Sequence, residues 1–62
     1  MMNKKLYVIV NLDYLFLNYK DNIIQYGKGD DATTFDSYEL AGKFIYGHQL
    51  INVEIKGFYK QV

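Results

Sequence analysis

The chain has 62 residues, half of them hydrophobic, and seven lysines balance seven carboxylates, so the formal net charge is zero. It contains no cysteine and no arginine, which excludes disulfides, thiolate metal sites and bidentate guanidinium contacts to phosphates or guanine edges. The zero net charge also disfavours an electrostatically driven nucleic-acid binder and a densely acidic DNA mimic. Because a chain this short has a small core, we expect one domain over residues 1–62.

Residues 1–17 contain lysines followed by apolar residues, as a signal peptide does. However, Asn11 and Asp13 interrupt the apolar run, and no small-residue cleavage site follows. The run is also shorter than the roughly 20 apolar residues that span a bilayer. We therefore expect a cytoplasmic protein with no membrane segment.

The first strand is predicted at residues 4–10, which are rich in β-branched and aromatic residues. Alternation divides its apolar side chains between two faces, with Leu6, Val8 and Val10 on one and Tyr7 and Ile9 on the other. Because both faces are apolar, this strand is expected at the centre of a sheet or beneath an additional covered surface.

Two further strands follow at residues 14–19 and 23–27. Turn-forming residues 11–13 precede the second strand. Asp21 and Asn22, which tolerate positive φ, separate it from the third. The two strands are therefore predicted to pair as a hairpin.

A helix is predicted at residues 37–47, with Asp36 as its N-cap and Glu39 completing a capping-box pattern. Gly47 is expected to end it in a left-handed conformation, and Gly42 to cost about 1 kcal/mol unless it permits close packing. The apolar stripe at helical spacing comprises Leu40, Ala41, Phe44, Ile45 and His48.

The last strand is predicted within residues 51–60, where Ile51, Val53 and Ile55 alternate with polar residues, and Gly57 is expected to mark a bulge. The element order is therefore β-β-β-α-β. This order favours an α+β fold, a small two-layer domain in which one helix packs on one face of an antiparallel sheet of three to four strands.

The glycine-rich segment at residues 27–35 does not have the spacing of a phosphate-binding or calcium-binding loop. Asp30 and Asp31 would repel a phosphate, so we interpret the segment as a connection that delivers Phe35 to the core and Asp36 to the helix cap. The single histidine, His48, has no predicted metal-ligand or nucleophile partner. We therefore expect no catalytic residues, no metal and no cofactor, and hence not an enzyme.

The seven tyrosines cannot all be central in so small a domain, and exposed tyrosine is enriched in protein interfaces. The candidate partner contacts are Tyr7, Tyr14, Tyr19 and Phe58. Ordinary packing at the rim of the core explains exposed tyrosines equally well. A third interpretation is stacking of single-stranded bases on the aromatic rings beside Lys4, Lys5, Lys20, Lys56 and Lys60.

Three stretches, "KLYVIVNLDYLFLN", "DDATTFDSYELAGKFI" and "NVEIKGFY", together resemble small phage and prophage proteins of low-GC Gram-positive bacteria. The resemblance covers most of the chain and implies an accessory protein that binds, inhibits or redirects a host protein. The sequence thus favours a non-enzymatic protein-binding module. A single-stranded nucleic-acid binder and a structural homodimer with mutually buried sheet faces remain as alternatives.

Overall fold

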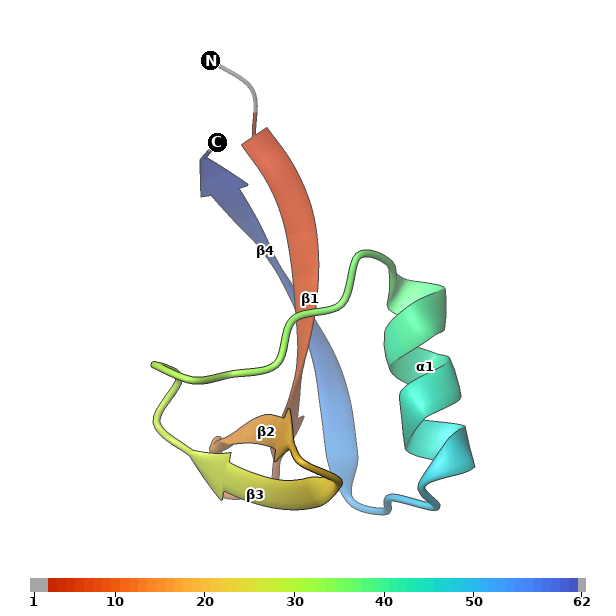
Figure 1. The fold of residues 1–62 in the computed structure, drawn as a ribbon. Coiled ribbons are helices and arrows are strands. Elements are labelled where there is room, and N and C mark those ends of the chain that lie inside the picture. Colours follow the sequence, from red (N-terminus) through yellow and green to blue (C-terminus); the bar gives the residue numbers. More distant parts are fainter. Residues whose placement is uncertain (1–2, 62) are drawn as a thin grey trace.

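The computed structural model describes residues 3–61, which form one helix and one four-stranded antiparallel sheet (Figure 1). The elements are β1 (Asn3–Asn11), β2 (Phe16–Lys20), β3 (Ile23–Gly27), α1 (Tyr38–Gly47) and β4 (Val53–Gln61). The strands lie in the order β3-β2-β1-β4, and α1 packs on one face against β1 and β4. The predicted two-layer α+β fold is confirmed. Within residues 3–61, no helix has the length and apolar character needed to cross a bilayer.

Strand β1 is central, as its apolar pattern predicts. It pairs with β4 along its whole length, from Asn3↔Gln61 to Asn11↔Val53, but its pairing with β2 is confined to Val10↔Phe16. Beyond that point Phe35 takes the place of β2, because Tyr7 and Phe35 exchange both main-chain hydrogen bonds, at 2.9 and 2.8 Å. The segment after β3 therefore fills the gap where β1 and β2 diverge.

Thr33 fixes this segment to β2. Its N–H donates to the carbonyl oxygen of Leu17 at 3.0 Å, and its Oγ1 accepts from the N–H of Tyr19 at 2.8 Å. These bonds satisfy main-chain groups of β2 that β1 no longer reaches. The predicted delivery of Phe35 to the core is confirmed, since Phe35 packs against the core cluster.

Both faces of β1 are covered. On the helix side Ile9, Leu17 and Ala41 are fully buried and form the core cluster. On the opposite face Leu6, Val8 and Val10 are 8%, 4% and 3% exposed. The expectation of an additional covered surface is confirmed, since these three side chains are buried.

Asp21 and Asn22 have φ of 54° and 65°, as expected for the β2–β3 hairpin turn. Strand β2, however, begins two residues later than predicted. Tyr14 has a φ of 60°, and the Oδ1 of Asn11 accepts from the N–H groups of Asp13 and Leu15. This side-chain bonding turns the chain through Tyr14 and keeps it out of the strand.

Both predicted helix caps are wrong. Ser37 is the N-cap: its backbone is extended and its Oγ accepts from the N–H of Leu40 at 3.0 Å. Asp36 instead forms an exposed ion pair with Lys4 at 3.2 Å. At the other end Gly47 stays helical, and Gln49 adopts the positive φ of 55°.

Replacing Ser37 with alanine should therefore destabilise the domain by about 1 kcal/mol, because the N–H of Leu40 loses its acceptor. Replacing Asp36 with alanine should change stability by less than about 0.5 kcal/mol, because its ion pair is exposed. Urea denaturation of both variants measures the difference. A larger loss for the Asp36 variant would contradict the assignment of Ser37 as the cap.

The predicted bulge at Gly57 is absent, since the β1–β4 register runs through Tyr7↔Gly57 without a break. A Cβ at Gly57 would lie 2.8 Å from Lys5 Cε and 3.2 Å from Tyr7 Cε2. The glycine is therefore a site of close side-chain approach, because the neighbouring strand's side chains occupy the space above it.

Candidate interaction surfaces

The four candidate partner contacts lie in different environments. Tyr7 and Tyr19 are half-buried and pack against the helix-side core. Tyr14 is 75% exposed in the β1–β2 turn. Phe58, 39% exposed, pairs with Leu6 and so lies on the opposite face of the sheet. The structure therefore does not unite these residues in one exposed patch.

Tyr19 has a structural role. Its ring contacts Phe44 at 5.0 Å and His48 at 5.2 Å between centroids, and its hydroxyl lies 3.0 Å from Asn22 Oδ1. His48 in turn stacks on Phe44 at 4.0 Å, with its Nδ1 3.0 Å from the carbonyl oxygen of Phe44. Removing Tyr19 would therefore disturb the core as well as any contact it makes.

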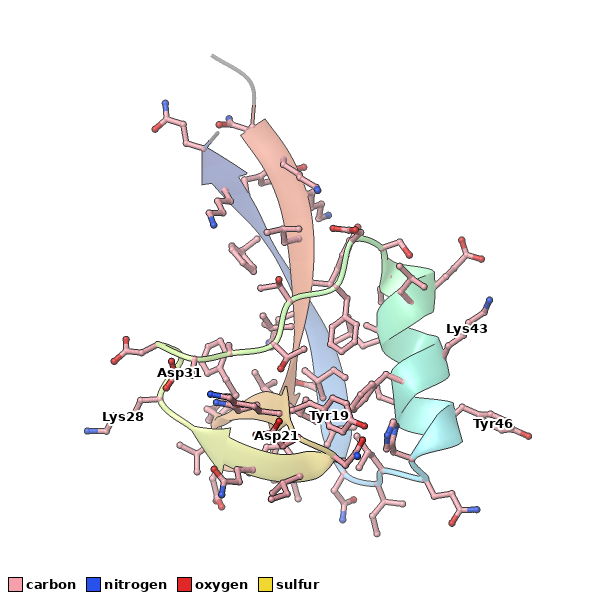
Figure 2. All side chains as sticks on the ribbon, viewed as in Figure 1. Tyr19, Asp21, Lys28, Asp31, Lys43 and Tyr46 are labelled. Atoms are coloured by element: carbon pink, nitrogen blue, oxygen red, sulfur yellow. The ribbon has the colours of Figure 1, made fainter. Side chains whose placement is uncertain are left out.

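The glycine-rich loop after β3 packs over β2. Gly29, with a φ of 87°, lies so that a Cβ would be 3.8 Å from the ring of Phe16, and its carbonyl oxygen accepts from the N–H of Ala32. Lys28 extends away from the domain (Figure 2). Within residues 3–61, no three His, Asp or Glu side chains gather as a metal site. The loop's observed contacts are those of a connection that covers Phe16.

A largely apolar groove lies beside the C-terminal half of α1. We call it the helix-end groove; its volume is about 610 Å³, and it is lined by Gly42, Ile45, Tyr46, Gly47, Gln49, Leu50 and Ile51. Tyr46 is 87% exposed and projects away from the helix (Figure 2), while Ile51 is 80% exposed. Two large side chains thus stand almost fully in solvent beside a concave surface.

The α1–β4 loop accounts for the position of Ile51. Gln49 and Asn52 have φ of 55° and 59°, and the N–H of Leu50 donates to the carbonyl oxygen of Ile45. Leu50 consequently packs against the core, while Ile51 points to solvent. The sequence pattern assigned Ile51 to the strand with Val53, which was wrong because β4 begins at Val53.

Gly42 and Gly47 keep this side of α1 open. Apart from the nearby backbone of the helix itself, a Cβ at either position would meet no atom of residues 3–61 within 4 Å. Neither glycine therefore permits close packing within the chain, although a mid-helix glycine costs about 1 kcal/mol relative to alanine. Gly42 therefore destabilises the helix without improving packing inside the domain, and it faces open space beside the helix.

Lys4 and Lys60 are directly opposite each other on the β1–β4 ladder, and Lys5 follows Lys4 on β1. Lys56 lies nearer the middle of β4, opposite Val8. Lys20 lies apart from them, at the end of β2. Lys5 Nζ lies 5.5 Å from the ring centre of Tyr7 and 5.6 Å from that of Tyr59. On the face of the sheet opposite α1, a groove of about 790 Å³ includes Phe16, Phe58 and Lys60 in its lining.

Comparison of the chain with protein-family models, with curated proteins and with solved structures found no match.

Proposed function

We propose that this protein is a non-enzymatic accessory module that binds another protein through the helix-end groove. The observation that carries the proposal is the pairing of that groove with Tyr46 and Ile51, which are 87% and 80% exposed. Tyrosine and other large apolar side chains beside a pocket are typical anchors of protein interfaces. Burying them on a partner removes apolar surface that the fold leaves in water.

The two glycines of α1 also favour the helix-end groove as the binding surface. Gly42 and Gly47 have no side chains of their own, and no side chain of residues 3–61 comes within 4 Å of where a Cβ would lie at either position. A partner can therefore come close to the helix backbone there. The stability lost by placing glycine in a helix is consistent with a function at this site.

The kind of partner follows from the resemblance of the sequence to small phage and prophage proteins. On that basis the partner is a host protein, and the site of action is the cytoplasm of the host cell. The module would inhibit or redirect that protein by occupying its surface.

Affinity capture with groove variants tests the proposal. The immobilised chain is incubated with a low-GC Gram-positive lysate after nuclease treatment, and one discrete protein should be retained. Ile51→Thr should reduce its retention at least about tenfold, because an exposed anchor is truncated. Ile23→Thr is the matched control, since Ile23 is also an exposed isoleucine, 57% exposed on β3, and does not line the groove.

Gly42→Gln separates binding from folding in the same experiment. A good helix former should hold or raise the melting temperature, because the added side chain meets open space. It should nevertheless abolish retention by filling the groove. Equal retention by wild type, Ile51→Thr and Gly42→Gln, or no protein retained by wild type, would overturn the proposal.

A second candidate, binding of single-stranded nucleic acid, is favoured by one observation. Lys4 and Lys60 are directly opposite on the β1–β4 ladder, and Phe58 lies between Lys56 and Lys60 on the same face of β4. Basic side chains interleaved with an exposed ring suit base stacking. This candidate predicts that nuclease abolishes retention and that oligonucleotide binding weakens steeply with salt.

A further inference from the structure

Within residues 3–61, the outer edge of β4 from Val53 to Tyr59 has no neighbouring strand. Tyr7 directs its N–H and carbonyl to Phe35, so the Tyr7↔Gly57 pair exchanges no hydrogen bonds. The N–H and carbonyl of Gly57 therefore point away from β1. By alternation the main-chain groups of Val53, Ile55 and Tyr59 also face outward.

This edge is long and exposed. Strand β4 has nine residues, is the last strand of the sheet, and is exposed from Lys56 to Gln61. In Figure 1 the upper parts of β1 and β4 extend beyond the loop and the helix as a two-stranded ribbon. A long edge strand of this kind is a template for pairing with another strand.

We propose that a second copy of this chain pairs with β4 in antiparallel fashion, about a two-fold axis at Gly57. Gly57 then faces Gly57 of the second copy, and Ile55 faces Tyr59. Each such pair exchanges both N–H···O bonds, because these residues present their main-chain groups outward. The two sheets become one continuous sheet, with both helices on the same face.

Charge complementarity selects this partner and this register. With Gly57 on the axis, Glu54 of each copy lies directly opposite Lys60 of the other, giving two opposite-charge pairs across the interface. Lys56 lies opposite Phe58, whose ring its aliphatic stem can cover. The pairs that carry this register run from Glu54 to Lys60.

The adjacent registers bring like charges together. Pairing Ile55 with Gly57 places Lys56 opposite Lys56 of the second copy. Pairing Gly57 with Tyr59 places Lys56 opposite Lys60. Like charges directly opposite destabilise a strand pair, and edge lysines normally prevent strand addition. Only the two-fold at Gly57 overlaps β4 fully and pairs its charges favourably.

The side chains on the helix face fit the same arrangement. Ile55 opposite Tyr59 is a β-branched–aromatic pair, a favourable combination across strands. Tyr59 is 68% exposed in the single chain, so pairing covers its ring. At the axis, Gly57 contributes no side chain, and Lys5 and Tyr7 occupy the space above it within each copy.

Charge-reversed variants and sedimentation equilibrium test the proposal. Wild type should show a monomer–dimer equilibrium over a concentration series. Glu54→Lys alone and Lys60→Glu alone each place two like-charged pairs in the homodimer, so each should weaken association by about tenfold or more. An equimolar mixture should restore the dimer, because both pairs between positions 54 and 60 are then of opposite charge. Lys28→Glu, which carries the same charge change as Lys60→Glu but in a loop outside β4, is the control and should dimerise as wild type does.

Tyr59→Pro provides a test that does not depend on charge. Its N–H points outward, so proline there spares the bonds to β1 but removes a donor from the interface. The variant should be monomeric and folded by circular dichroism. A monomeric wild type, or a mixture of charge variants no more associated than its components, would overturn the proposal. The dimer and the helix-end groove are tested independently. Ile51→Thr should still dimerise, and Tyr59→Pro should still retain the captured protein.

Discussion

Replacing Ile9 with alanine should reduce the free energy of unfolding by about 2–5 kcal/mol. Ile9 is fully buried near the C-terminal end of β1, pairs with Ile55 of β4, and forms the core cluster with Leu17 and Ala41. Truncation removes buried apolar surface and leaves a cavity that the surrounding strands cannot close. A domain of this size has about 3–9 kcal/mol of stability in total, so the variant should be largely unfolded at ordinary temperatures.

Ile9→Val should remain folded, so its free energy of unfolding can be measured, and the expected loss is about 0.5–1.5 kcal/mol. Ile23→Ala is the control on an exposed strand position and should cost less than about 0.5 kcal/mol. Denaturation is followed at one fixed protein concentration, because association would otherwise contribute to apparent stability. Equal losses for Ile9→Ala and Ile23→Ala would contradict the core described above.

Replacing Phe44 with alanine should cost about 3–5 kcal/mol. Phe44 contacts three other rings, those of Tyr19, Phe35 and His48, at centroid distances of 5.0, 5.3 and 4.0 Å. These contacts join α1 to β2 and to the segment that follows β3. Losing them removes apolar burial and ring-to-ring interactions together.

Tyr46→Ala is the matched control for Phe44→Ala, because it removes a ring from the same helix two residues away. Tyr46 is almost fully exposed and should contribute less than about 0.5 kcal/mol to stability. Thermal unfolding of the two variants gives the comparison directly. A melting temperature lowered equally by both changes would mean that α1 packs on the sheet through a different face.

The sequence predicted the element order and the layers because local patterns determine them. Alternation identified β1 as a strand with two apolar faces, and Asp21 with Asn22 identified the hairpin turn. The caps were missed because adjacent residues compete for one role. Both Asp36 and Ser37 are good N-caps, and the ion pair of Asp36 with Lys4 depends on a strand distant in sequence.

The candidate surfaces were less predictable than the fold. Tyr7, Tyr14, Tyr19 and Phe58 were chosen for their chemistry, but exposure depends on which face α1 covers. The exposure of Ile51 was not predicted, because its regular spacing with Val53 assigned it to the strand. The positive φ of Gln49 and Asn52 turns Ile51 toward solvent. The clearest sequence signal of the helix-end groove was Gly42. A glycine inside a helix lowers helix stability, and no packing contact within the domain explains its presence.

A footprint of the captured protein on the isotope-labelled chain tests the central claim most directly. Backbone amide resonances are compared with and without the partner by NMR. The account predicts that the largest changes fall at Gly42, Tyr46, Leu50 and Ile51, around the helix-end groove. Changes confined to Phe58, Lys60 and the opposite face of the sheet would contradict it, and would place the binding surface on the other side of the domain.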